Sequence, residues 1–406
     1  MRAGSGRAPH RPVALVPAVT MNQRTGTALR LSFYYAALFT AVGAHMPFWP
    51  LWLKDKGLGP TDIGLIMAAT YLTKIMVSPS VGHLVDRHGD RRKPMLILAG
   101  AATAIWLLFT LTDGFWPILA VTVLAVGLWS GIFPLGESLS MMESQRQRLD
   151  YGRLRLWGSL SFIASAIATG ALMTSQPPPV LVWVVAAALA LTTLSCWSLP
   201  ASTAISARSD RRTPIWPLLK HPAFLAFLAV ASLGSASHTV YYAFATIHWQ
   251  AAGIDGNTIG LLWAEGVIAE VLLFAFSGWV VGKLGPGKLL IIATAAGILR
   301  WLALGSVTAV PALAIAQLLH AATFGCAHLG AMHFITRAVP HSLSARAQGM
   351  LSAVAMGAAP GLMSPLAGRL YDGMGGGAFL VMSALSVAGF ALALLLAKRW
   401  DGKPLV

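Results

Sequence analysis

Charged side chains are scarce in this chain, at 11% of its 406 residues, whereas an ordinary soluble domain carries about 25%. Hydrophobic residues make up 56% of the sequence, and the mean hydropathy is +0.68. A compact soluble domain cannot bury that much apolar surface, so the composition excludes a soluble protein. It indicates an all-α integral membrane protein whose main partner is the lipid bilayer.

Acidic residues are the scarcer charge, because 14 Asp and Glu stand against 29 Lys and Arg, which leaves a net charge of +15. In a soluble protein this excess would indicate nucleic acid as a partner. Here the basic residues lie between apolar runs instead of on one polar face. A membrane therefore explains them better, and no nucleic-acid partner is expected.

Cysteine is nearly absent, and the two that occur, Cys196 and Cys326, lie inside apolar runs. They exclude a disulfide framework, and no cysteine or carboxylate spacing supports a metal site. The sequence has no nucleotide-binding motif, so ATP is not expected to drive its activity, and no cofactor is expected. The charges scattered through the middle of the apolar runs argue against a membrane-embedded enzyme.

Twelve apolar runs are long enough for membrane-spanning helices, which need about 20 mostly apolar residues each. With the N-terminus placed inside, 24 Lys and Arg lie on the inner side of the membrane and 2 on the outer side. The positive-inside rule then predicts a multi-pass protein of the cell (inner) membrane with both termini in the cytoplasm. The predicted spans are 29–53, 61–83, 94–112, 116–142, 155–174, 179–199, 222–249, 257–280, 288–307, 310–335, 345–369 and 376–397.

The longest polar interruption follows the sixth run and divides the chain into two halves. Residues 29–200 and 221–398 are each predicted to form a six-helix bundle, and a cytoplasmic linker over 201–220 joins them. Residues 1–28 contain several Arg, Gly and Pro and are predicted to be a disordered cytoplasmic tail. Residues 399–406 are predicted to be a second cytoplasmic tail.

The two halves repeat each other, since residues 57–82 align without a gap on residues 253–278, at an offset of 196. Parallel six-helix halves of this kind are a transporter architecture, in which substrate binds near the bilayer midplane between the halves. The sequence therefore predicts twelve transmembrane helices in two pseudo-symmetric six-helix bundles. The glycines Gly57, Gly64 and Gly82 fall on Gly253, Gly260 and Gly278.

A charged, glycine-rich motif follows the second run and reads Gly82-x-Leu84-x-Asp86-Arg87-x-Gly89-x-Arg91-Arg92. Together with the twelve spans and the repeat, it resembles the loop signature of the major facilitator superfamily. The resemblance implies a conformational latch made by Gly82, Asp86, Arg87, Gly89 and Arg91. In this latch Asp86 docks against the cytoplasmic start of the eleventh helix, where the helix dipole favours an anion. The alternative is that the arginines only set the topology.

Charged residues inside predicted spans are functional candidates, because a lone ionised group at the bilayer centre costs about 2.5–3.5 kcal/mol. Lys74 in the second span aligns with Glu270 in the eighth, so both are expected at matching depth around one cavity. Arg300 lies in the ninth span, where it could pair with Glu270. We expect Lys74 and Arg300 to bind substrate, and Glu270 and Glu137 to carry protons. The alternative is structural ion pairing.

Histidines in the tenth span are candidates for proton transfer, because histidine titrates near neutral pH. His320 and His328 are 8 residues apart and therefore about 80° apart on an α-helix. The alternative for each is a hydrogen-bonded contact between helices.

Aromatic residues are candidates for holding an apolar substrate body. His238, Tyr241 and Tyr242 lie in the seventh span, and Phe48 lies in the first. The resemblance to the superfamily implies that these two helices line the cavity. We therefore expect all four side chains to contact substrate.

The segment Tyr151–Ser159 enters the fifth span and sharpens the resemblance. When this segment is included, the chain resembles the phenylpropionate permease branch of the superfamily over residues 29–395. This resemblance implies proton-coupled uptake of a small aromatic carboxylate, such as 3-phenylpropionate, by alternating access. The sequence differs at Lys74, where that branch can carry arginine, and at Pro360 and Pro365 in the eleventh span. Other motifs that carry the resemblance are Pro47-Phe48-Trp49, His238-x-x-Tyr241-Tyr242, Trp249–Gly253, Glu270, Arg300-Trp301, His320 and His328.

The residues permit this function, since two cations can hold a carboxylate and Glu270 can accept a proton that the proton gradient supplies. Two alternatives are a proton-coupled exporter of drugs or metabolites and a sugar- or nucleoside-type symporter. Residues 157–175 contain no proline, which argues against an exporter, but the Gly357-x-x-Pro360-Gly361 run keeps that alternative open. A monomer is expected.

Overall fold

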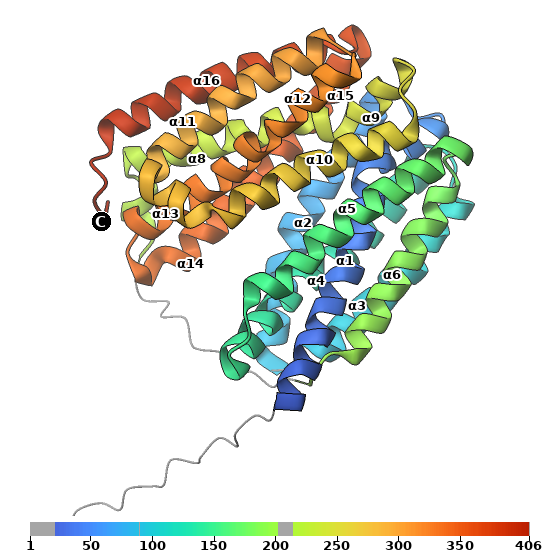
Figure 1. Cartoon of the computed structure of the whole chain (residues 1–406), viewed down its shortest axis with the longest axis horizontal. Helices are drawn as coiled ribbons and strands as arrows, with labels where there is room; N and C mark the ends of the chain where they lie inside the picture. The colour runs from blue at the N-terminus through green and yellow to red at the C-terminus, as the bar shows by residue number, and fades with distance from the viewer. Residues whose placement is uncertain (1–20, 89, 202–213, 406) are drawn as a thin grey trace, which may run out of the picture.

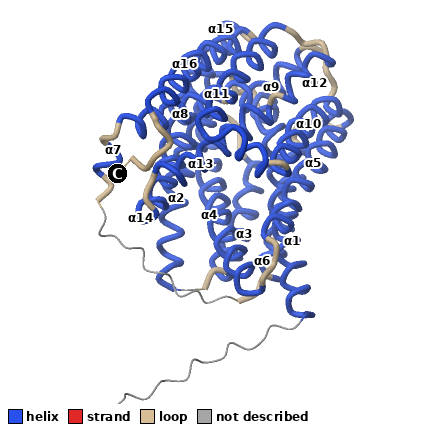
Figure 2. Tube along the Cα trace, turned by 60° about the vertical axis from the view of Figure 1, so that its left-hand side comes forward, coloured by secondary structure: helices blue, strands red, loops and turns tan. Residues whose placement is uncertain are grey.

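The computed structural model describes residues 21–88, 90–201 and 214–405, and for residues 78, 79 and 82–88 it describes the backbone alone. Within these ranges the regular elements are all helices, linked by loops (Figure 2). The N-terminal half comprises α1 (Met21–Asp55), α2 (Pro60–His88), α3 (Arg92–Leu107) with η1 (Leu108–Leu111), α4 (Phe115–Gln147), α5 (Tyr151–Ser175) and α6 (Val180–Ser198).

The C-terminal half follows the short helix α7 (Trp216–Leu219) and contains more helix breaks than the first half. It comprises α8 (Pro222–Ser237), α9 (Thr239–Ala251), α10 (Gly256–Ala275), α11 (Ser277–Ser306), α12 (Val310–Leu318), η2 (Ala321–Cys326), α13 (Ala327–Ala338), α14 (His341–Met350), η3 (Leu351–Ala358), α15 (Ala359–Met374) and α16 (Gly377–Arg399).

Ten helical segments of the described chain are long and apolar enough to cross a membrane, which confirms the predicted all-α membrane fold. The α1 and α2 helices, 35 and 29 residues long, are not among the ten. Both helices nevertheless pack among the other helices of the N-terminal half. For these two helices, membrane crossing stays a prediction.

Two predicted segments, the N-terminal tail and the linker, need correction. The predicted tail over residues 1–28 is wrong from residue 21 onward, because α1 begins at Met21. Contacts with the end of α4 hold this turn, since Arg24 Nε donates to Gln147 O at 2.7 Å and Gln147 Nε2 donates to Thr27 Oγ1 at 3.0 Å. Residues 1–20 lie outside the described part.

The linker predicted over residues 201–220 contains helix α7, and its residues 202–213 lie outside the described part. The predicted break between the eighth and ninth spans falls inside α11, where Gly285, with a φ of +71°, has non-helical backbone angles and Pro286 follows it. A shorter helical segment that begins at Ser277 precedes this kink. Glycine tolerates this φ, and proline cannot continue the preceding turn.

The two halves form separate bundles that meet at one end and diverge toward the other (Figure 1). The diverging end carries the start of α1 and the end of α16, so we call it the terminal face. The end where the bundles meet carries the α1–α2 and α9–α10 loops, and we call it the opposite face. The molecule is therefore open toward the face that carries the start of α1 and the end of α16.

Glycines make the contact between the bundles at the opposite face. A Cβ atom on Gly64 of α2 would lie 2.5 Å from the carbonyl oxygen of Ser364 in α15. A Cβ atom on Gly260 of α10 would lie 2.5 Å from the carbonyl oxygen of Ala166 in α5. No real side chain tolerates such distances, so only glycine lets these backbones approach. Because Gly64 and Gly260 are repeat partners, the sequence repeat corresponds to two equivalent closures between the halves.

We predict that Gly64→Ala opens the contact between α2 and α15. Its Cβ displaces the Ser364 backbone, whereas Gly278→Ala serves as a control because an added Cβ meets nothing within 4 Å there. Spin labels on cysteines at Gly59 and Gly373, in a variant without Cys196 and Cys326, report the separation by pulsed electron resonance. Gly64→Ala should add a longer distance that the control lacks, and identical distributions would contradict this role of Gly64.

Candidate functional site

Lys74 lies in the middle of α2 and projects into a cavity of about 320 Å³. The N-terminal half contributes only the α1 and α2 wall of this large cavity, and helices of the C-terminal half form the rest. Lys74 is exposed to the cavity, and no carboxylate of the described residues lies within 4.0 Å of its Nζ atom. Its Nζ atom lies 5.9 Å from the centroid of the Tyr71 ring. Within the described part of the chain, the site therefore offers a cation without a counter-ion.

Three more predicted site residues line the large cavity with Lys74, namely His238, Tyr242 and His328. His238 is buried and its Nδ1 atom lies 2.8 Å from the carbonyl oxygen of Gly234, at the break between α8 and α9. Its ring stacks on Tyr242 with centroids 5.7 Å apart. The structure thus places these residues together with Lys74 on the walls of one cavity.

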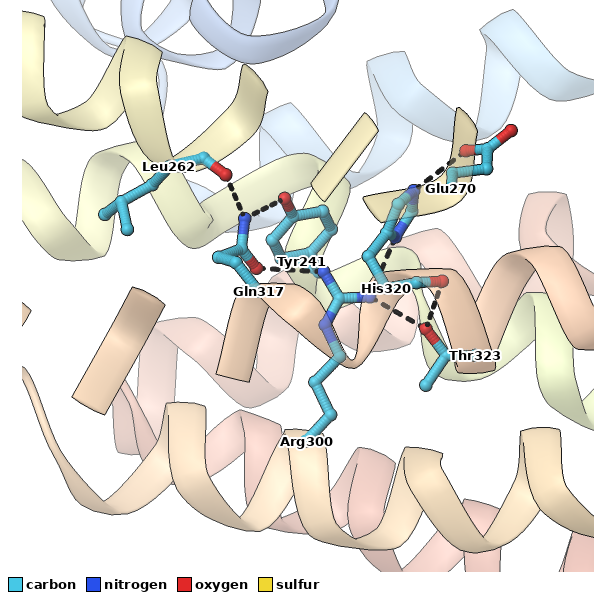
Figure 3. Close-up of polar contacts among 7 residues, drawn as sticks. All are labelled: Tyr241, Leu262, Glu270, Arg300, Gln317, His320 and Thr323. Atoms are coloured by element: carbon cyan, nitrogen blue, oxygen red, sulfur yellow. Dashed lines mark hydrogen bonds and ion pairs between the residues drawn. The ribbon is translucent and has the colours of Figure 1, made fainter. Parts of the chain in front are cut away.

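Arg300 of α11 is completely buried and does not line the large cavity. Its guanidinium donates to Thr323 Oγ1 at 2.9 Å and to Gln317 Oε1 at 2.9 Å, and lies 3.0 Å from His320 Nδ1 (Figure 3). It also lies 4.5 Å over the Tyr241 ring. These partners hold the cation in a fixed position behind the cavity wall, and Thr323, which lines the cavity, separates it from the open space.

Glu270 of α10 contacts Arg300 through His320 instead of pairing with it directly. The carboxylate lies 3.5 Å from His320 Nε2, and the other ring nitrogen of His320 lies against Arg300. Figure 3 shows the second carboxylate oxygen pointing away from the network. The Glu270 side chain is 18% exposed, so water can reach this oxygen. The three residues form a continuous chain from an accessible acid to a buried cation.

His320, Phe324 and His328 form a stacked column along the tenth predicted span. Phe324 lies 5.5 Å from His320 and 6.4 Å from His328, with the ring planes within 14° of parallel. In an ideal α-helix His320 and His328 would diverge by about 80°. The segment Ala321–Cys326 is instead a π-helix, whose wider turn aligns the rings. The alignment of the two histidines is thus a consequence of the helix break.

Glu137 of α4 lies in a separate cluster in the N-terminal half. Its carboxylate accepts hydrogen bonds from Tyr35 and Tyr151 and lies 3.4 Å from Arg155 Nε. Arg155 also lies 4.1 Å over the Phe39 ring. The structure therefore gives Glu137 a local counter-ion, Arg155, which is also near enough to Glu270 and His328 to interact with both electrostatically.

Several other predicted site residues do not line the large cavity, although Tyr241 belongs to the Arg300 network. Phe48 is fully buried and does not line the large cavity, and Tyr241 is buried behind the wall, where its hydroxyl accepts a hydrogen bond from Gln317 at 2.8 Å. Arg91 of the predicted latch is buried and donates from Nε to Ser138 Oγ at 3.1 Å. The side chains of the other latch residues, Gly82, Asp86, Arg87 and Gly89, lie outside the described part.

Gln317 is a member of the Arg300 network that sequence reasoning missed. It is fully buried in α12 and bonds Arg300, Tyr241 and the carbonyl oxygen of Leu262 at once. The sequence signal that could have identified Gln317 is its polar amide side chain inside an apolar span, three residues before His320. Among the residues described, no group of three or more His, Cys, Asp or Glu side chains could hold a metal ion.

We predict that Gln317→Leu destabilises the C-terminal bundle. The change removes a partner from Arg300 and from Leu262 O, and each buried unsatisfied group costs about 1–3 kcal/mol. Thermal unfolding of the purified protein should therefore start at a clearly lower temperature for Gln317→Leu than for Gln250→Leu, an exposed control. Equal unfolding temperatures would show that the network adds no stability.

Comparisons with known proteins show the family of this chain. The MFS_1 like family matches residues 28–381. A relative from Escherichia coli (strain K12), named "Probable 3-phenylpropionic acid transporter", is 32% identical over 375 residues, which are 89% of this chain and 96% of the relative. The maltose permease of Geobacillus stearothermophilus is 26% identical over 90% of this chain and 93% of its own length.

Solved structures show the same fold. The crystal structure of the nucleoside transporter NupG superposes with a TM-score of 0.78, at 16% identity, over 92% of this chain and 100% of that one. At this identity the likeness concerns the fold alone. Because the family match spans most of the sequence and the fold is that of membrane carriers, the chain is a transporter and not an enzyme, and it belongs to the MFS_1 like family.

Proposed function

We propose that this protein takes up a small aromatic carboxylate, of the 3-phenylpropionate type, together with protons. The observation that carries the proposal is Lys74, a cation that no described carboxylate pairs, at the wall of a cavity between the two halves. The relative named for 3-phenylpropionic acid supports the same substrate class. The proposal includes a monomer in the cell (inner) membrane with both termini in the cytoplasm.

The substrate carboxylate binds Lys74 in this proposal. A charge-assisted hydrogen bond to an unpaired ammonium contributes more than one to a neutral donor. Arg300 already has three partners and lies behind Thr323, so it acts on the substrate through its positive field and through the position of Thr323 and His320. The apolar body of the substrate contacts Tyr242 and the other aromatic walls.

Glu270 and His320 carry the proton in this proposal. Lys74 and Arg300 together exceed the charge of Glu270 by one positive unit, and a bound carboxylate cancels that unit. If a proton binds Glu270 at the same time, the occupied site has the same net charge as the empty one. Both forms then reorient without an added electrostatic penalty, which links proton binding to substrate binding. The column from His320 to His328 extends the path along the cavity wall.

Reorientation alternates the opening between the two faces. The present structure is closed by the glycine contacts at the opposite face and diverges at the terminal face. Release toward the cytoplasm follows if both termini lie there. The predicted latch residues Gly82, Asp86, Arg87, Gly89 and Arg91 would close the terminal face in the alternate state.

Uptake into vesicles tests the function. Purified protein is reconstituted into sealed vesicles, and uptake of radiolabelled 3-phenylpropionate is measured under three conditions. These are an acidic exterior, equal pH on both sides, and an acidic exterior with a protonophore. Protein-free vesicles under the same gradient correct for diffusion of the neutral acid through lipid. Gradient-driven accumulation above that background supports the proposal. Accumulation of labelled maltose or uridine instead, or gradient-driven extrusion of the acid, would support the sugar, nucleoside or exporter alternatives.

We predict that Lys74→Gln raises the apparent KM for 3-phenylpropionate by at least about tenfold, because it removes a charge-assisted bond worth about 1.5–3 kcal/mol. Inhibition by the neutral 3-phenylpropionamide should change little, and Lys74→Arg should retain most of the affinity. Lys56→Gln, which removes a lysine paired with Asp113 at the opposite face, is the matched control. Equal losses for acid and amide would argue against a carboxylate at Lys74.

We predict that Glu270→Gln abolishes accumulation driven by a pH gradient while exchange of labelled for unlabelled substrate continues, because exchange needs no net proton movement. Glu265→Gln on the same helix should retain both activities, since Glu265 has no recorded contact with the network. Both modes are measured in the same vesicle preparations. Persistent accumulation by Glu270→Gln would exclude Glu270 as the proton carrier.

A further inference from the structure

A second, smaller cavity of about 140 Å³ adjoins Lys74 inside the N-terminal half. Helices α1, α2 and α4 form its walls, and α9 contributes one residue, Tyr242. It shares Met46, Tyr71, Lys74 and Tyr242 with the large cavity, so these four residues form the boundary between the two spaces. A ligand anchored at Lys74 can therefore extend into either cavity.

The walls of the smaller cavity are largely aromatic. Six rings line it: His45, Trp49, Tyr71, Trp129, Phe133 and Tyr242. The His45 ring stacks on Trp49 with centroids 5.3 Å apart and meets Trp129 edge-on at the same distance. Rings fixed in such edge and stacked arrangements present both faces and edges to a further ring.

Two hydroxyls that line this cavity are already bonded, whereas the buried Trp129 Nε1 has no hydrogen-bond partner among the described residues. Thr70 and Ser130 donate their hydroxyls to carbonyls of their own helices, at Ile66 and Gly127. The cavity thus has apolar and aromatic walls with one cation, Lys74, at its edge. An apolar cavity of roughly 150 Å³ is large enough to bind benzene, which matches the volume found here.

We propose that this smaller cavity, the ring pocket, binds the aryl ring of the substrate while Lys74 binds its carboxylate. This inference rests on the proposed function and adds the location of the ring. It assigns ring specificity to the N-terminal half and proton coupling to the C-terminal half, with Lys74 between them. The arrangement also favours carboxylates in which a short chain separates the ring from the charge, because Lys74 lies at the edge of the ring pocket.

A change in the size of the pocket tests the assignment. Phe133→Ala enlarges the ring pocket, and the apparent KM for 3-phenylpropionate should rise about tenfold through lost ring contacts, while that for 3-(2-naphthyl)propionate should fall. Phe324→Ala is the matched control, because Phe324 lines only the large cavity. In Phe324→Ala the ratio of the KM for 3-phenylpropionate to that for 3-(2-naphthyl)propionate should stay as in the wild type, even if the transport rate changes. A shift of the ratio in Phe324→Ala but not in Phe133→Ala would overturn the ring pocket.

Photolabelling of the unaltered protein gives a second test that does not depend on folding of a variant. The probe is 3-(4-azidophenyl)propionate, with excess 3-phenylpropionate as competitor. Competitor-sensitive labels should lie on the pocket segments 42–50 and 126–133. Labels on α8, α11 or α13 alone would place the ring in the large cavity and overturn the inference. That outcome leaves the proposed function standing if uptake is normal, whereas absent uptake of 3-phenylpropionate by the wild type refutes both.

Discussion

Lys74, a lysine that no described carboxylate pairs, in a helix predicted to cross the membrane, is the constraint on which the rest of the account depends. A lone charge at that depth is costly, by about 2.5–3.5 kcal/mol on insertion scales. Proteins retain such groups when water, a partner or a ligand compensates them. Arg300 is compensated by Gln317, Thr323 and His320, and Arg155 by Glu137, but no described carboxylate compensates Lys74. A substrate anion is the compensation that the transport function supplies.

The division of labour between the halves follows from how their polar residues are arranged. In the C-terminal half, breaks and a π-helix bring His320 against Glu270 and stack its ring, through Phe324, toward His328 on the wall of the large cavity. In the N-terminal half, continuous helices pack aromatic rings around a small space beside Lys74. The pseudo-symmetry of the sequence thus produces equivalent glycine closures at the opposite face, whereas the midplane residues of the two halves have diverged. Lys74 and Glu270, which are repeat partners, have become a substrate anchor and a proton carrier in this account.

The sequence predicts the fold well because the bilayer dictates the length of each apolar run and because the repeat fixes the order of the halves. It predicts which charged residues matter, since charges in apolar runs are rare. It does not predict how they pair. The expected contact of Glu270 with Arg300 passes through His320, and Phe48 and Tyr241 lie behind the walls. These outcomes depend on rotamers, on the π-helical turn and on Gln317, none of which leaves a periodic signal.

The measurement that tests the central claim most directly is an experimental structure of the protein with 3-phenylpropionate bound. The account predicts a carboxylate oxygen about 2.7–3.2 Å from Lys74 Nζ, within hydrogen-bonding distance, with the phenyl ring among Trp49, Trp129 and Phe133. A bound carboxylate far from Lys74, or a Lys74 side chain occupied by a protein carboxylate while substrate is present, would contradict it.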